Sequence, residues 1–336
     1  MNPFAIDPSG SGMCRFGRVA RLFLILLIFY GICCVRPAAT VGSRRPCTIV
    51  MLPDTQMYSK SRPDLFHAQT RWIRQNREKE NIVFVTQVGD IVNDRGKAKD
   101  QWAVATGAMA TLDGVVPWGV AIGNHDFDGS ADKTAATVFL EHFGPKRFHG
   151  RPWYGGAAPN GLSSYQLFSG AGVDFIALQL EIDIPDPAIA WAVDVLRRHP
   201  TRAAIVSTHA YLKGRDGETR NTRPAYDKNG NSGEQVWNKL IRGNPQIFAV
   251  LCGHEGRTDE YHQISTNDAG NKVLEMLADY QKRSNGGDGW LRLIRLVPSD
   301  GRIEVRTYSP ALDRFETDPN SEFVVPLELP GTVRSR

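Results

Sequence analysis

Five short apolar runs constrain the fold of this 336-residue chain more than any other feature, because a possible metal ligand follows each of them. The runs are rich in Val, Ile and Phe, which is typical of buried strands. The runs and the residues that follow them are 47–52 with Asp54, 82–88 with Asp90, 115–122 with Asn124, 203–206 with His209, and 247–251 with His254. Ligands of open α/β sheets bind beyond the carboxyl ends of the strands. The pattern therefore predicts that these five side chains share one site.

Amphipathic stretches between and around these runs predict helices. They cover 63–80, 98–112, 131–143, 187–198 and 233–242. Residues 163–180 are typical of a hairpin, and the segment after His254 is rich in strand-forming residues. Alternation of strands and helices favours an α/β protein. We predict one globular domain in which two packed mixed β-sheets are flanked by helices, a four-layer αββα sandwich.

The first forty residues form a separate segment. Arg15, Arg18 and Arg21 precede an apolar run over 22–30 that continues weakly to residue 35, and small residues follow at 38–40. This order is typical of a secretory signal. The run is short for a membrane span, which needs about 20 apolar residues. We expect residues 1–40 to be a signal peptide or an N-terminal anchor through residues 22–35, residues 41–336 to be the functional domain, and the protein to be exported to the periplasm or the extracellular space.

Charge and cysteine content weigh against some function classes. Residues 1–40 hold four of the 40 basic residues and one of the 36 acidic residues, so residues 41–336 carry a net charge of +1. This balance gives no strong sign of nucleic-acid binding, which weakens the reading as an exported nuclease. Cys47 and Cys252 are the only cysteines after residue 40, and we expect buried free thiols.

Glycine precedes several of the possible ligands. The segments are Gly89-Asp90-Ile91-Val92-Asn93-Asp94, Gly123-Asn124-His125-Asp126 and Gly253-His254. Glycine permits tight turns and the close approach of an ion or a phosphate. A single Asp or Asn after a strand is usually a turn former or a helix cap. Five donors in order indicate instead a site for Mn, Fe, Zn or Ni.

With these motifs the chain resembles the calcineurin-like metallophosphoesterases over residues 54 to 256. The pattern of that family is Asp-x-His, Gly-Asp-x-x-Asn/Asp, Gly-Asn-His-Asp/Glu, an isolated His, and Gly-His-x-His. The resemblance implies a metallophosphoesterase-like αββα fold and one or two divalent metal ions. It also implies hydrolysis of a small phosphomonoester or phosphodiester by metal-activated water.

The resemblance also implies roles for single residues. Asp90 would bridge two metal ions, Asn124, His209 and His254 would complete the second metal site, and Asp54 with Gln56 would belong to the first. His125 would be the general acid. Many relatives orient this histidine with the last acid of Gly-Asp-x-x-Asp, but that position is Asn93 here. Asp126 is then the nearest acidic residue for the orienting role.

Two departures from the pattern fall on the first metal site. Gln56 stands where a histidine is usual, and Gly256 stands where the final histidine would be. We therefore expect the second site to bind its metal firmly and the first weakly or not at all. Glu255, His262 and Asp216 are candidates to replace the missing ligands, and the segment 279–281 after a strand-like run is a candidate to reach the site from the second sheet. The departures also motivate an alternative function, a degenerate binding protein with one metal and little activity.

Two long connections are a further feature of the sequence. Segments 144–161 and 212–232 are polar and rich in Gly and Pro, and we expect long loops there. Arg220 and Arg223 lie in the second of these loops. Arginine suits phosphate binding, but we expect both side chains to be solvated.

Overall fold

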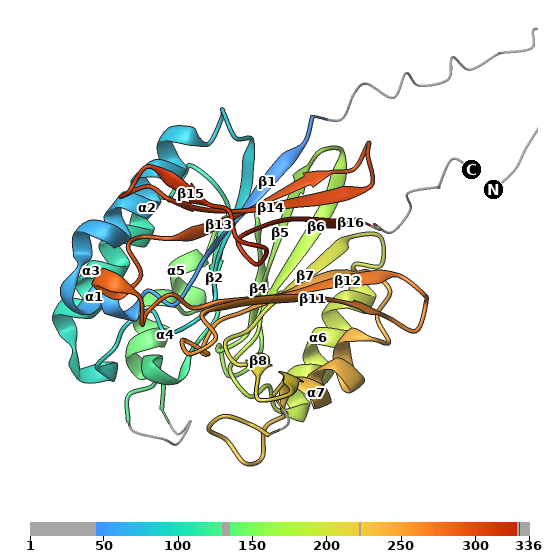
Figure 1. The fold of residues 1–336 in the computed structure, drawn as a ribbon. Helices are drawn as coiled ribbons and strands as arrows, with labels where there is room; N and C mark the ends of the chain where they lie inside the picture. Colours follow the sequence, from blue (N-terminus) through green and yellow to red (C-terminus); the bar gives the residue numbers. More distant parts are fainter. Residues whose placement is uncertain (1–44, 130–134, 222, 328, 330–336) are drawn as a thin grey trace, which may run out of the picture. The chain divides into compact units, whose positions relative to one another are not determined.

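Two seven-stranded mixed sheets form the centre of the protein, which a computed structural model describes over residues 45–129, 135–221, 223–327 and 329 (Figure 1). The first sheet has the order β15-β14-β13-β1-β2-β3, and β16 also pairs with β14. Its strands are β1 Cys47–Leu52, β2 Ile82–Gln87, β3 Trp118–Val120, β13 Leu291–Val297, β14 Arg302–Ser309, β15 Arg314–Glu316 and β16 Glu322–Pro326.

The second sheet has the order β11-β12-β10-β7-β6-β5-β4. Its strands are β4 Tyr154–Ala157, β5 Ser164–Gly170, β6 Val173–Gln179, β7 Ala203–Ser207, β10 Ile247–Cys252, β11 Glu260–Thr266 and β12 Lys272–Ala278. A separate two-stranded hairpin consists of β8 Leu212–Arg215 and β9 Glu218–Arg220.

Helices cover the outer face of each sheet. Those beside the first sheet are α1 Gln56–Ser61, α2 Pro63–Asn76, α3 Lys99–Ala110, α4 Thr137–Phe143 and α5 Pro145–Phe148 (Figure 1). Those beside the second sheet are α6 Asp186–Arg198 and α7 Gly233–Val236, which continues as a π-helical turn over Trp237–Ile241. This arrangement confirms the predicted four-layer αββα sandwich.

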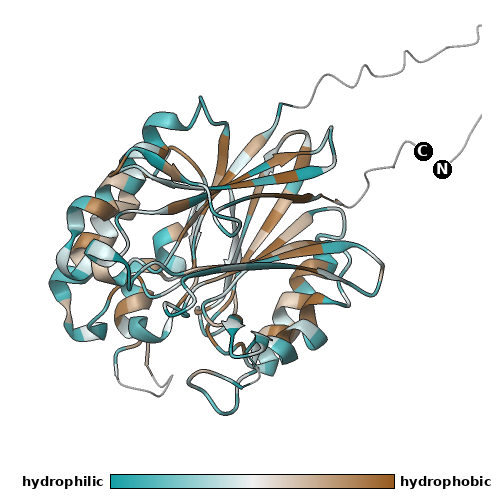
Figure 2. Cartoon of the chain, in the orientation of Figure 1, coloured by the Kyte–Doolittle hydropathy of each residue, from teal (hydrophilic) through white to brown (hydrophobic). Residues whose placement is uncertain are grey.

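The strands are buried on both faces because each sheet packs against its partner sheet and against helices. In β1, Val50 and Leu52 pack under the helices, whereas Ile49 and Met51 pack between the sheets. This alternation follows from the two-residue period of a strand. Figure 2 shows the hydrophobic residues concentrated along the strands. Cys47 and Cys252 are buried and unpaired, as predicted.

The structure also corrects several predicted boundaries. The helix expected over 63–80 ends at Asn76, and Asn81 adopts a left-handed conformation (φ 49°) that turns the chain into β2. The strand expected over 115–122 is only three residues long. The segments expected to be loops contain α5 and β4 in one case and the β8–β9 hairpin in the other.

Residues 1–40, with their predicted signal or anchor and its apolar run over 22–35, lie outside the described residues. The described residues all belong to one compact unit. Within the described residues, no helix combines the length and the apolar character needed to cross a membrane.

Candidate metal centre

The predicted site residues converge because five parallel strands end at one edge of the two sheets. In the first sheet β1, β2 and β3 are parallel, and Asp54, Asp90 and Asn124 follow them. In the second sheet β7 and β10 are parallel, and His209 and His254 follow them. Asp54, Asp90, Asn124 and His209 are all at most 3% exposed. The structure thus places the side chains of both sheets in one buried cluster.

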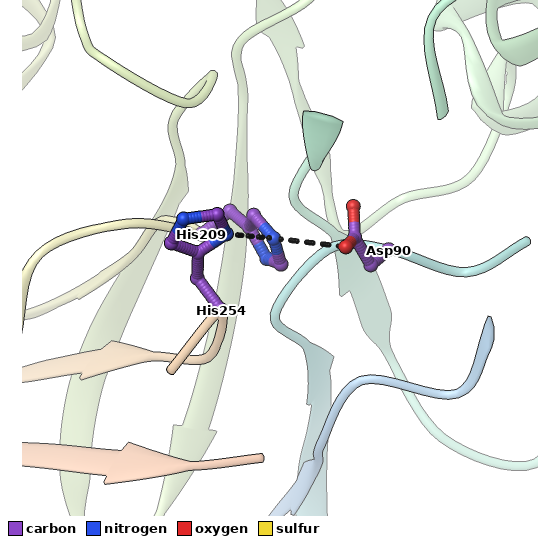
Figure 3. Close-up of side chains that lie close together, drawn as sticks. All are labelled: Asp90, His209 and His254. Atoms are coloured by element: carbon purple, nitrogen blue, oxygen red, sulfur yellow. Dashed lines mark hydrogen bonds and ion pairs between the residues drawn. The ribbon is translucent and has the colours of Figure 1, made fainter. Parts of the chain in front are cut away.

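Asp90, His209 and His254 form the closest group of ligands (Figure 3). The Nε2 atom of His209 lies 3.2 Å from Oδ2 of Asp90 and 3.3 Å from Nδ1 of His254. Metal–nitrogen bonds of 2.0–2.1 Å in a tetrahedral site put neighbouring ligand atoms about 3.3 Å apart. The spacing of these three ligand atoms therefore fits a divalent ion.

Hydrogen bonds fix the orientation of His209. Its Nδ1 atom lies 3.0 Å from the carbonyl oxygen of Val88. A carbonyl only accepts, so Nδ1 donates, and Nε2 is the nitrogen that faces Asp90. Hydrogen bonding of the second ring nitrogen to a carbonyl is a common feature of metal-binding histidines.

The electrostatics of the cluster favour a cation. Burial disfavours the charged form of His209, but Asp90 and Asp54 outweigh burial and raise the pKa of His209 to about 10. Burial opposes ionisation of Asp90, yet the charge and hydrogen bond of His209 lower the Asp90 pKa to about 2. Burial and the nearby His209 lower the pKa of His254 to about 4. Positive charge is thus stabilised at the point where the three side chains meet.

Asn124 supplies a fourth donor. It lies in a short 3₁₀ helix, Asn124–Asp126, and its Oδ1 atom is buried with no hydrogen-bond partner among the described residues. A buried carbonyl oxygen without a partner is costly, and a metal ion would satisfy it. Asp90, Asn124, His209 and His254 therefore fit the second metal ion that the family implies.

Backbone conformation brings these ligands close together. Asp90 (φ 51°) and His254 (φ 75°) are both left-handed, and strained residues of this kind cluster at functional sites. Gly89 (φ 101°) leaves room for His209, whose Nδ1 would lie 2.7 Å from a Cβ at that position. A side chain at Gly89 would therefore displace a ligand.

His125 lies beside the cluster, but Asp126 does not orient it as predicted. The backbone N–H of His125 donates to Oδ1 of Asp90 (2.8 Å), and its ring Nδ1 lies 2.6 Å from the carbonyl oxygen of Asn93. No described hydrogen bond joins Asp126 to the ring. The prediction was wrong because it considered side chains only, whereas a backbone carbonyl holds the imidazole.

The Asp126 carboxylate instead joins two loops of the site. It accepts hydrogen bonds from the backbone N–H groups of Ile91 (2.8 Å), Val92 (3.2 Å) and Gly123 (2.8 Å). Burial, and after it the charge of Asp90, raise the pKa of Asp126 to about 7, although the amides favour the carboxylate. Asp126 thus fixes the loop that holds Asp90 against the loop that holds Asn124.

Around Asp54 the donors differ from those of the second site. Asp54 accepts from the backbone N–H of His254 (3.2 Å to Oδ2) and is 1% exposed. Gln56 is also buried, and its Nε2 donates to Oε1 of Gln281. Gln281 in turn donates to Asp279. The sequence raised the segment 279–281 as a candidate to reach the site, and its side chains do reach it.

The other proposed replacements have different partners. Glu255 and Asp216 both pair with Arg215, at 3.0 Å and 2.5 Å. His262 stacks on Phe323. These three residues were expected as candidates for the first site, but salt bridges and aromatic packing engage them elsewhere.

Two further clusters of charged residues have structural roles. Glu260, Glu316 and Asp318 lie close together, but Arg283 already pairs with Glu316 and Arg292 with Glu260. Arg220 was expected to be solvated, but its side chain is only 10% exposed: it pairs with Glu275 at 2.6 Å and covers the ring of Trp237. We assign none of these residues to the metal centre.

Comparison with known proteins gives a consistent assignment. Residues 47–257 match the family model of the calcineurin-like phosphoesterases. The chain is 35% identical over 301 residues to the uncharacterized protein YvnB of Bacillus subtilis (strain 168). The match covers 85% of this chain but 22% of YvnB, so the chain spans less than a quarter of that relative.

Solved structures show the same fold at low sequence identity. A dimetal phosphatase from Danio rerio has a TM-score of 0.50 and 13% identity, over 84% of this chain and 99% of that chain. Purple acid phosphatase PPD1 from yellow lupin (Lupinus luteus) seeds has a TM-score of 0.54 and 12% identity, over 84% and 54% of the two chains. The family match over residues 47–257, which include all the converging ligands, shows that the chain belongs to the calcineurin-like phosphoesterases.

Proposed function

We propose that the protein hydrolyses a small phosphomonoester or phosphodiester in a metal-dependent reaction, with His125 as the general acid. One observation carries this proposal: Asp90, His209 and His254 meet at ligand spacing, and the backbone N–H of His125 donates to the same Asp90 while its ring is held by the Asn93 carbonyl. A pure metal-binding module has no need of a third imidazole that is held apart from the two ligating ones.

The residues of the chain divide the chemistry between them. When bound, the metal ion polarises a phosphoryl oxygen and lowers the pKa of water, which supplies the nucleophile. Asp90, Asn124, His209 and His254 hold the ion, and the burial of Asp90 and His209 excludes bulk water.

His125 provides the proton for the leaving group. Its Nδ1 donates to the Asn93 carbonyl, so Nε2 is the atom from which the protonated ring donates. Transfer of this proton to the leaving oxygen contributes typically about 10²–10⁴-fold to the rate.

A cavity of about 460 Å³ adjoins His254 and is a candidate site for the rest of the substrate. The cavity is lined mostly by polar and charged residues: Lys213, Glu218, Asn221, Arg223, Ala225 and Glu255. Asp183 fixes one side, because its carboxylate accepts from the backbone N–H groups of Ala225 and Tyr226 at 2.7 Å and 2.6 Å. The polar lining and the size support a small, polar alcohol as leaving group.

The test is turnover of an aryl phosphomonoester and an aryl phosphodiester by the full chain with a panel of divalent metals. His125→Ala should lower turnover by about 10²–10⁴-fold and leave the metal content unchanged. His149→Ala, at an exposed histidine, is the matched control and should retain full activity. The preferred ester sets the subclass.

The alternative is a degenerate binding protein with one metal ion, which the replacements Gln56 and Gly256 favour. It predicts a folded protein that retains an ion but turns over neither ester with any metal. That outcome would refute the hydrolase proposal.

We also propose that residues 1–40 export the protein. Fractionation of cells that produce the full chain should place it in the periplasm or the medium, and a chain without residues 1–40 should remain in the cytoplasm. Equal distribution of both versions would contradict this proposal.

A further inference from the structure

Gly256 stands at the position of the missing histidine, and Asp279 lies directly beside it. A Cβ at Gly256 would lie 3.0 Å from Oδ2 of Asp279 and 3.1 Å from Cγ of Gln281. The space that a histidine side chain would enter is therefore next to a carboxylate. This carboxylate comes from a different strand, 23 positions further along the chain.

The topology explains how Asp279 reaches the site. β12 pairs in parallel with β10, with Cys252 opposite Leu277. Asp279 therefore follows the end of β12 at the same edge where His254 follows the end of β10. Asp279 is therefore an acidic residue at the end of β12, a strand that is additional to the five that precede the predicted ligands. It is completely buried.

Asp54 and Asp279 are two buried carboxylates that, among the described residues, have no cationic partner other than histidine. In the described part of the chain, neither lies within ion-pair distance of a Lys or Arg, and His209 approaches Asp54 only to 4.0 Å. Burial, together with the charge of the other aspartate in the case of Asp54, raises the pKa of both, that of Asp279 to about 6. Buried carboxylates of this kind require a cation or strong hydrogen bonds.

A single amide lies between the two carboxylates. Nε2 of Gln281 is 2.9 Å from Oδ2 of Asp279 and 3.5 Å from Oδ2 of Asp54. Gln56 contacts the same Gln281 side chain, and Oε1 of Gln56 is buried with no hydrogen-bond partner among the described residues. The Gln281 amide N–H carries only a partial positive charge. Oε1 of Gln56, a neutral oxygen beside it, makes no hydrogen bond among the described residues.

We propose that Asp279 replaces the missing histidine and completes a first metal site made only of oxygen donors, from Asp54, Asp279 and Gln56. The inference rests on the proposed function and deepens it. Carboxylate and amide oxygens favour hard ions such as Mn²⁺ and Mg²⁺, whereas the two imidazoles of the second site suit Zn²⁺ or Fe. The first site therefore binds Mn²⁺ or Mg²⁺ exchangeably, and the second site retains its ion.

The experiment counts ions independently of catalysis. The full chain is stripped of metal with a chelator and titrated with MnCl₂ by calorimetry, and bound Mn is measured by elemental analysis after equilibrium dialysis. The wild type should bind two Mn²⁺ ions with unequal affinity. Asp279→Asn should weaken the lower-affinity site at least tenfold and leave the other unchanged. Asp268→Asn, at an exposed aspartate, is the control and should match the wild type.

A second variant guards against loss of folding. Gly256→His combined with Asp279→Ala restores the usual histidine and removes the carboxylate that it would meet. It should again bind two ions, now with Zn²⁺ preferred over Mn²⁺ at the first site, and circular dichroism confirms that each variant is folded. The inference is overturned if the wild type binds one Mn²⁺ at saturation, or if Asp279→Asn binds two as tightly as the wild type.

The two proposals fail separately. If Asp279→Asn reduces the number of bound ions from two to one but the wild type hydrolyses no ester, the proposed metal site stands and the proposed hydrolase activity is refuted. Hydrolysis by a chain that holds a single ion would do the reverse.

Discussion

Gly89→Ala tests whether close packing of the turn against His209 keeps the metal site intact. The new Cβ would lie 2.7 Å from Nδ1 and 2.9 Å from Cβ and Cγ of His209, whereas ordinary contacts begin at 3.4 Å. His209 or the turn must therefore move by about 0.5–0.7 Å, against a tolerance of about 0.2 Å in metal–ligand distances. Disturbance of groups that orient a metal ligand typically weakens metal affinity by about 10–100-fold, and we expect a loss in that range.

Backbone strain has to be separated from this displacement. Gly89 has φ 101°, so alanine is strained there in addition to the clash, at a cost of about 1–3 kcal/mol. Gly270→Ala is the matched control, because Gly270 has φ 84° but nothing within 4 Å of the new Cβ. Both variants should unfold at lower temperature, but only Gly89→Ala should lose metal affinity in a calorimetric titration. Equal metal affinity of the two variants would show that close packing of the turn against His209 does not determine metal binding.

Three other predictions follow from the structure. Arg220→Met should lower the free energy of unfolding by about 3–5 kcal/mol, because it leaves the fully buried Glu275 without its ion-pair partner. The double variant Arg220→Met with Glu275→Leu should recover much of this loss in denaturant titrations. If it recovers nothing, the loss does not come from an unpaired Glu275. Burial raises the pKa of the Cys47 thiol to about 12 and that of the Cys252 thiol still higher, so the thiolate form is scarce at pH 8 and increases only as the pH rises toward these values. Peptide mass spectrometry should find both thiols unalkylated by iodoacetamide at pH 8 in the folded chain and alkylated in denaturant. Rapid alkylation of the folded chain would show that the thiols are exposed. Removal of metal should lower the melting temperature, because an ion at 100 times its Kd adds about 2.7 kcal/mol of stability; an unchanged melting curve after chelation would show that the ion does not bind the folded chain preferentially.

The sequence predicted that Asp54, Asp90, Asn124, His209 and His254 lie together because the relevant signals are local. Each of these residues follows an apolar run, and parallel strands end at a common edge, so the five could be grouped without knowledge of the strand order. Their division between two metal sites came from the family resemblance. The same signals predicted the αββα layers. Boundaries were less accurate where turn conformations end an element, as at Asn81 after α2.

The first metal site depends on contacts that are distant in sequence. Gln56 and Gln281 are separated by 225 positions, and only the pairing of β12 with β10 brings Asp279 beside Gly256. The support of His125 was missed for a different reason. The group that faces its ring is the backbone carbonyl of Asn93, and a backbone atom leaves no signal in residue identity.

We expect Asp90, Asn124, His209 and His254 to hold a divalent metal ion. Anomalous diffraction from crystals of the full chain grown with Mn²⁺ or Zn²⁺ tests it most directly. We predict an anomalous peak about 2.0–2.3 Å from Nε2 of His209 and from an oxygen of Asp90, with Oδ1 of Asn124 and a nitrogen of His254 also coordinated. Absence of anomalous density at this site at saturating metal, or a metal ion bound by other residues, would show that these four residues do not form the metal site.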